Sequence, residues 1–369
     1  MLRTAASLQR VEPGFRPAGL LTFNVAIPAA IGGPGDRARL VDAFERSVRD
    51  LPETNAVGTV GGLPLGDVVF RQPYGPEGST PEDWSANEAN FRVITAEYFD
   101  ALGTRLLAGR SFTPAENVSE DERVAIVDAK LAAKLAPDGN AVGQRIGFPL
   151  DGDPIYATVV GVVENVRFHG LREAGRETIY VPYRQEASRA VSMAVRTTGR
   201  SEALIGSIEG IARSLSGGVP IPVYEFREME SFVARALAPT RFAMTVIAIF
   251  AALAVGLAGV GLFGVISFAV SRRTREFGIR FALGAQTSQI LIEVLAGGLG
   301  LAAIGLLVGV ALAWTGASAA ETLLHGVGRA DLPTYALVAF VLLAITVLAT
   351  WLPARRAASV QPIAALKHE

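Results

Sequence analysis

Hydrophobic and polar positions divide the chain near residue 240. Beyond this point, three apolar runs contain no Asp, Glu, Lys or Arg, at residues 242–270, 294–320 and 332–354. Each run exceeds the roughly 20 residues that cross a bilayer core, where only a helix or a closed barrel satisfies the backbone. We therefore expect three transmembrane helices. Three buried helices of a soluble core are a weaker interpretation, because core helices seldom stay uncharged over such lengths.

The pattern before residue 235 predicts two similar βαβ units. Strands are expected at residues 20–27, 56–60, 191–196 and 219–224, and the alternation in 191–196 is typical of a half-buried strand. A helix is expected between the two strands of each unit, at residues 36–50 and after Ser201, which we expect to cap the second helix. The inward faces of these helices are formed by Leu40, Phe44 and Val48 and by Leu204, Ile208, Ile211 and Leu215.

Residues 91–183 separate these units and are predicted to form a β-rich insertion. β-branched runs lie at residues 124–127, 157–163 and 178–181, with turns expected at Gly103, Gly109, Gly143 and Gly147. The expected fold is therefore an α+β domain over residues 1–235, with split ferredoxin-like βαβ units around the insertion. An all-α membrane domain with three transmembrane helices follows over residues 236–369.

A further helix is predicted just before the first apolar run. Met229, Phe232, Val233 and Ala236 share one face of it, and Pro239 interrupts the pattern. Such a helix could carry a displacement into the membrane or simply pack on the preceding domain, and the pattern fits both.

The arginines predict how the chain is oriented in the membrane. The linker after the first run and the C-terminal tail are rich in basic residues, whereas the loop at 318–331 holds a single basic residue. The basic residues of the linker and tail are Arg272, Arg273, Arg275, Arg280, Arg355, Arg356 and Lys367. The positive-inside bias places linker and tail in the cytoplasm and residues 11–235 outside a bacterial cytoplasmic membrane. Three arginines before the first run, Arg227, Arg235 and Arg241, oppose this bias. The apolar run in residues 1–10 is too short to act as a signal peptide or anchor that would bring residues 11–235 across the membrane. We therefore expect a first transmembrane helix to be missing.

Composition narrows the function. The 369 residues are 50% hydrophobic and 19% charged with a net charge of −1, which argues against a nucleic-acid partner. There is no Cys, and the three histidines, His169, His325 and His368, fall in separate parts of the chain, so we expect no metal site. The sequence also lacks the phosphate loop G-x-x-x-x-G-K-[ST] and the nucleophile elbow G-x-S-x-G. We therefore expect no catalytic residues and no ATP hydrolysis by this chain.

Small residues recur at four-residue spacing in the first two runs. Ala252 and Gly256 form part of one stripe, and Gly305 and Gly309 part of the other. Such stripes mark helix contacts within or between subunits. No charged residue lies at the middle of a run, which disfavours an ion-coupled secondary transporter.

Two cytoplasmic motifs carry a family resemblance. Residues 273–285 read R-T-R-E-F-G-I-R-F-A-L-G-A, which resembles the R-E-I-G-I-R-x-A-L-G-A signature of the FtsX/MacB family of ABC transporter permeases, with Phe277 in place of Ile. The tail, P-A-R-R-A at 353–357 and Q-P-I-A-A-L at 361–366, resembles the family's P-A-R-R-A…D-P-I-x-A-L ending. Residues 98–112 are similar to the Y-F-x-x-L-G…L-L-x-G-R-x-F segment of the MacB-like periplasmic core domain.

The resemblance implies an ABC permease subunit for efflux or export, of the second-half kind found in duplicated MacB-type permeases. It implies partners as well: an ABC ATPase subunit that binds the ATP, a second copy or permease half, and a periplasmic accessory protein. No cofactor is expected in this chain. An alternative from another class is an FtsX-like regulator that activates an external cell-wall enzyme. The family's ATPase-coupling helix maps onto Arg275, Glu276, Phe277, Gly278, Ile279, Arg280, Leu283, Gly284 and Ala285.

Overall fold

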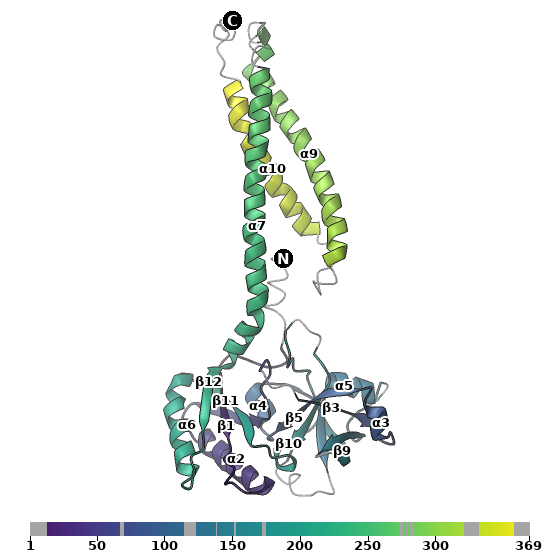
Figure 1. The fold of residues 1–369 in the computed structure, drawn as a ribbon, viewed down its shortest axis with the longest axis vertical. Helices are drawn as coiled ribbons and strands as arrows, with labels where there is room; N and C mark the ends of the chain where they lie inside the picture. Colours follow the sequence, from purple (N-terminus) through teal and green to yellow (C-terminus); the bar gives the residue numbers. More distant parts are fainter. Residues whose placement is uncertain are drawn as a thin grey trace. The chain divides into compact units, whose positions relative to one another are not determined.

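The computed structural model describes residues 13–66, 70–113, 123–137, 139–150, 153–171, 175–273, 276–277, 279–280, 283–320 and 332–357. The chain forms two compact units that meet in sequence between Pro239 and Thr240. The first unit is a mixed sheet with helices, and the second is helical (Figure 1).

The four strands of the two predicted βαβ units lie side by side in one sheet. Their order is β12-β1-β11-β2, and all three pairings are antiparallel. Because strands from the two ends of the unit alternate, the βαβ units interleave as the sequence predicts. The elements are β1 (Leu20–Ala26), α2 (Pro34–Arg49), β2 (Thr54–Val60), β11 (Ala190–Thr197), α6 (Ser201–Leu215) and β12 (Val223–Glu228).

The insertion continues this sheet and does not form a separate one. Its strands extend the order from β2 through β5-β10-β7-β9-β8-β4, and β3 and β6 pair with β5 and β9. The junction is narrow, since β2 and β5 share the single register pair Val60 and Ile94. The strands are β3 (Arg71–Pro73), β4 (Gly75–Pro76), β5 (Glu88–Ile94), β6 (Leu106–Gly109), β7 (Val124–Asp128), β8 (Arg145–Leu150), β9 (Asp153–Val163) and β10 (Thr178–Pro182).

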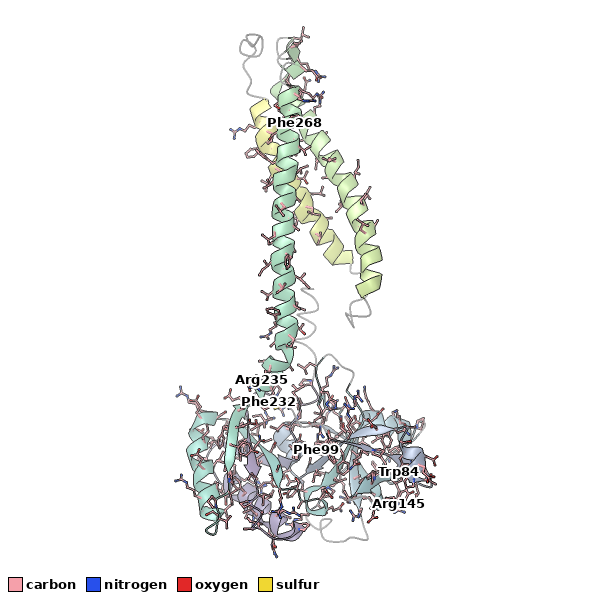
Figure 2. All side chains as sticks on the ribbon, in the orientation of Figure 1. Trp84, Phe99, Arg145, Phe232, Arg235 and Phe268 are labelled. Atoms are coloured by element: carbon pink, nitrogen blue, oxygen red, sulfur yellow. The ribbon has the colours of Figure 1, made fainter. Side chains whose placement is uncertain are left out.

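Three short helices accompany these strands, α3 (Pro81–Trp84), α4 (Tyr98–Leu102) and α5 (Ala129–Leu135), which the sequence did not predict. α4 contacts β2 and β11, α3 contacts β8, and α5 contacts β7. Trp84 of α3 is buried and packs its ring edge-on against Tyr156 of β9 (Figure 2). Asp128 accepts a hydrogen bond of 2.9 Å from the Leu131 N–H, which caps α5.

Two hydrophobic clusters cover the two faces of the sheet. One contains Phe44 and Val48 of α2 with Leu204 and Ile208 of α6. The other contains α4 and the first residue of α7 (Met229–Arg272), with Phe232 and Val233 packed against it. The start of α7 therefore packs on the sheet, and the helix continues through Pro239. Arg227 and Arg235 both lie within cation–π range of the Phe232 ring, at 6.0 and 5.9 Å (Figure 2).

Some local predictions were wrong. Strand β11 is buried on both faces, because Met193 belongs to one cluster and Ala194 to the other. Arg200, and not Ser201, occupies the N-cap position of α6. The last strand begins only at Val223, since the prolines at 220 and 222 have no N–H to donate to a ladder.

Gly147 is also not a turn, because it lies within β8. A Cβ at this position would come within 2.4 Å of the Trp84 ring. The residue is therefore small for packing, whereas Gly103 and Gly143 have the positive φ angles of turns, +73° and +93°.

The second unit contains the rest of α7, α9 (Thr287–Ala320) and α10 (Leu332–Ala357). Within the described residues, α7 and the part of α9 from Ser288 to Leu312 are long and apolar enough to cross a membrane. In α10 the described apolar stretch, Val338–Trp351, is shorter than the length required of a membrane span. The backbone is helical over each predicted run, and two of the three runs meet the length and composition expected of a span.

Candidate coupling site

The linker between α7 and α9 forms a short capped turn of helix. Residues 276–277 and 279–280 are helical, and the Leu283 N–H bonds the Ile279 carbonyl at 3.1 Å. The Ala285 N–H then reaches back to the Arg280 carbonyl at 3.0 Å, and Gly284 has a φ of +93°. This is the Schellman ending, in which a left-handed residue, usually glycine, terminates the helix. The L-G-A part of the motif thus fixes where the linker helix stops.

Four charged side chains bind one another around this turn. Glu276 accepts hydrogen bonds from Arg273 at 2.9 Å and Arg280 at 2.6 Å. Glu293, nearly two turns into α9, accepts from the same two arginines at 3.0 and 2.8 Å. Each charge therefore contacts two of opposite sign. The bond from Arg273 is the main cause of a lowered pKa for the Glu276 carboxyl, so this acid stays ionised.

An aromatic anchor holds the linker against the helices. The Phe277 side chain is 1% exposed and packs with Ile290 of α9, next to Val270 and Val294. Arg273 lies over its ring at 5.4 Å. The anchor and the ion-pair network together fix the linker to α9 and to the end of α7.

The predicted coupling residues therefore divide into two groups. Glu276, Phe277 and Arg280 are engaged within the chain, whereas Ile279 and Leu283 are exposed, at 48% and 83%. The family resemblance assigns Phe277 to the coupling helix, and its side chain is buried within this chain. Arg275 and Gly278 lie outside the described residues.

Among the residues that the structure describes, the small-residue stripes lie away from neighbouring helices. Ala252 and Gly256 are exposed, and a Cβ at Gly256, Gly305 or Gly309 would meet no atom within 4 Å among the described residues. Close approach occurs instead at Gly298, where a Cβ would lie 2.4 Å from Thr350 of α10. Contacts of the predicted stripes with another subunit remain a prediction.

No cluster of His, Cys, Asp or Glu that could hold a metal was found in the described part of the chain. The Nε2 of His169 pairs with the Asn90 side chain at 2.7 Å. This contact links the segment between β9 and β10 to β5.

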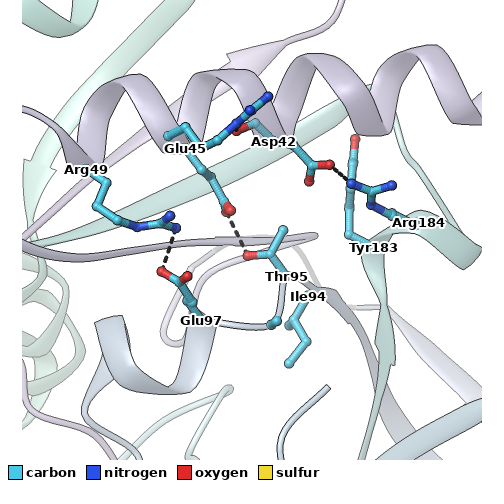
Figure 3. A pocket seen from close by; sticks show the side chains of 10 residues that line it. Asp42, Glu45, Arg49, Ile94, Thr95, Glu97, Tyr183 and Arg184 are labelled. Atoms are coloured by element: carbon cyan, nitrogen blue, oxygen red, sulfur yellow. Dashed lines mark hydrogen bonds and ion pairs between the residues drawn. The ribbon is translucent and has the colours of Figure 1, made fainter. Parts of the chain in front are cut away.

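A polar pocket in the first unit was missed by the sequence analysis. Its cavity of about 370 Å³ lies beside α2 and is lined by residues of α2, of the segment after β5 and of the 3₁₀ turn at Tyr183–Gln185 (Figure 3). Glu45 of α2 is 6% exposed and accepts hydrogen bonds from the hydroxyls of Thr59 at 2.6 Å and Thr95 at 2.7 Å. Burial is the main cause that raises the pKa of Glu45 from 4.5 to about 7.

A sequence signal for this residue existed. Glu45 lies four residues after Val41 and beside Phe44, both of which are buried, so it belongs to the inward edge of the helix. Its two hydroxyl partners lie in β2 and just after β5, and the local pattern does not reveal these contacts.

Comparison with known proteins gives two family matches that cover most of the chain. Residues 7–211 match the MacB-like periplasmic core domain, and residues 248–362 match the FtsX-like permease C-terminal region. The first match alone covers more than half of the chain.

Similar proteins carry related names. The macrolide export ATP-binding/permease protein MacB of Chromobacterium violaceum is 28% identical over 87% of this chain and 51% of its own length. The ABC transporter permease YknZ of Bacillus subtilis, described as uncharacterized, is 28% identical over 76% of this chain and 70% of its own. The chain thus spans about half the length of this MacB relative.

Among solved structures, the periplasmic region of MacB from Actinobacillus actinomycetemcomitans is 15% identical with a TM-score of 0.37, and the match covers 61% of this chain and 95% of that one. The family assignment depends on the two sequence matches and on the motifs that they contain. The chain belongs to the FtsX/MacB family of ABC transporter permeases, with a MacB-like periplasmic core domain followed by an FtsX-like permease region.

Proposed function

We propose that this chain is a permease subunit that couples ATP hydrolysis by a separate ABC ATPase to movement of its extracytoplasmic domain, for efflux or export. The observation that carries the proposal is the division of the linker into a fixed side and a free side. Phe277 and the network of Arg273, Glu276, Arg280 and Glu293 attach it to the helices. Ile279 and Leu283 remain exposed for a partner.

This arrangement suits the transmission of force. An ATPase bound at Leu283 would move a linker whose charged side chains and aromatic anchor are bound to α9 and the residue after α7. Because several ion pairs and the Phe277 side chain hold the linker to the helices, a displacement of the linker would be transmitted to both α7 and α9. Arg273 and Glu276 support this at physiological pH, because the guanidinium is always charged and the carboxyl titrates below its ordinary range.

The membrane arrangement belongs to the same proposal. Three helices cross a bacterial cytoplasmic membrane, with α10 as the third, and the basic linker and tail face the cytoplasm. The first unit then lies outside. The subunit pairs with a second copy or permease half through the exposed stripes at Gly256 and Gly305, and an accessory protein binds the external unit. The name of the Chromobacterium relative, a macrolide exporter, supports export as the activity.

A docking variant tests the proposal. Leu283→Ser removes the most exposed apolar side chain among the described residues of the linker and leaves Phe277 and the ion pairs in place. Loss of such an anchor at an interface centre costs about 2 kcal/mol, or roughly thirtyfold in affinity. The measurement is recovery of the native ATPase with the tagged full-length permease from its own membrane.

Leu107→Ser is the matched control, because Leu107 is an exposed leucine of the external unit, at 46%. It should leave recovery of the ATPase unchanged. The purified chain alone should hydrolyse no ATP. Unchanged ATPase recovery and stimulated hydrolysis in Leu283→Ser would refute docking through this surface.

A further inference from the structure

One face of α2 crosses the junction between the two halves of the sheet. Asp42, Glu45 and Arg49 follow one another at spacings of three and four residues, which places them on the same side of the helix. Each contacts a residue that follows a strand of the insertion. Asp42 pairs with Arg184, Glu45 bonds Thr95, and Arg49 pairs with Glu97 at 2.5 Å (Figure 3).

The charges in this pocket are not all neutralised. Three acids and three arginines line it, and two pairs form, between Asp42 and Arg184 and between Arg49 and Glu97. Arg46 directs its Nε–H to the Asp42 carbonyl at 3.2 Å. Within the described residues, Glu45 has no cation within ion-pair distance, and both of its hydrogen bonds fall on Oε1. Its second oxygen is left for another group.

A buried carboxylate without a cation is costly, and the protein reduces this cost by protonation. Burial outweighs the two hydroxyl bonds and the attraction of Arg49 in setting the pKa of Glu45 near 7. The other ionisable groups that face it are Asp42 and Arg46 of α2, Glu97 after β5, and Tyr183 and Arg184 after β10. The carboxyl is therefore close to the balance point between its two states, and a cation beside it would select the ionised one.

We propose that this pocket binds a small molecule with one ammonium group, which pairs with the carboxylate of Glu45, and with a small apolar body against Ala96. The cavity of about 370 Å³ is within the range of small-molecule sites, and most of the residues that line it are charged. A cation is favoured over an anion because the buried Glu45 lacks a counter-charge, whereas Arg49 and Arg184 have carboxylate partners and Arg46 is exposed to solvent.

Three probes with one body and different heads test this site, 2-phenylethylamine, 2-phenylethanol and phenylacetate. Binding to the full chain in detergent is measured by titration calorimetry at pH 6 and pH 8. Because a bound ammonium holds Glu45 ionised, the amine should bind about tenfold more tightly at pH 8 than at pH 6. Its binding at pH 7 should release about half a proton, which appears as a dependence of the heat on the buffer used.

Glu45→Gln keeps an oxygen acceptor for Thr59 and Thr95 and removes the charge. This variant should lose amine binding at least tenfold and should release no proton. Glu209→Gln, the same change at an exposed position of α6, should behave as the unchanged chain. Tighter binding of phenylacetate, equal amine binding by Glu45→Gln, or no binding of any probe would overturn the proposal, and unchanged unfolding of the variant shows that it is folded.

Discussion

Glu45→Gln also tests the electrostatics of the fold itself, without any ligand. Burial raises the pKa of Glu45 from 4.5 to about 7, so the folded state binds this proton more tightly than the unfolded state does. The sign follows directly. The stability that this proton contributes is fully present below pH 4.5, declines as the pH rises, and is lost above pH 7. The full effect is about 3 kcal/mol, of which about 1 kcal/mol is lost between pH 6 and pH 8.

The pH range matters because a second buried acid behaves similarly. Burial raises the pKa of Asp128 from 3.8 to about 6, so most of its effect lies below pH 6. Urea unfolding at pH 6 and pH 8 therefore reports mainly on Glu45. Trp84 is the tryptophan of the first unit, and its fluorescence can be followed once Trp314 and Trp351 are changed to Phe.

Glu45→Gln should remove most of the loss of unfolding free energy between pH 6 and pH 8. Glu209→Gln should retain it, because Glu209 is exposed. An equal loss in both variants would refute the assignment of this titration to Glu45.

Three further predictions concern topology, capping and helix packing. Single cysteines at Ser271 and Gly139 should differ in intact cells, with an impermeant thiol reagent labelling only the second, and the reverse pattern would contradict the proposed orientation. Asp128→Ala should lower the free energy of unfolding of the first unit by about 1 kcal/mol or more, measured by urea unfolding, because the cap of α5 is lost. Gly298→Leu should destabilise the purified chain by about 1–3 kcal/mol in thermal unfolding, whereas Gly305→Leu should not, because only Gly298 is in close contact with a neighbouring helix.

The sequence predicted helices and strands correctly where only one face of the element is buried. In α2, the four-residue spacing of Leu40, Phe44 and Val48 identified the helix and its inward side. In β11 the strand itself was predicted correctly, but its expected half-burial was wrong, because both Met193 and Ala194 are covered by hydrophobic clusters.

The functional residues were predictable only in part, for a similar reason. The linker motif identified Leu283 and Phe277 as apolar positions of one helix, but only tertiary packing determines which of them is buried. The environment of Glu45 depends on Thr59 and Thr95, which lie 14 and 50 residues away in the sequence. Contacts of this range are invisible to local periodicity.

The narrow junction of the sheet gives the first unit a defined line of mechanical compliance. Long ladders resist shear because many hydrogen bonds must break together, as between β1 and β11, which share seven register pairs. Between β2 and β5 the ladder has the one pair Val60 and Ile94. A force that pulls the two halves apart would therefore concentrate at this line, and the contacts of α2 with Arg184 and Glu97 would resist it as a brace. Stretching experiments on this unit should rupture there first, leaving each half of the sheet intact.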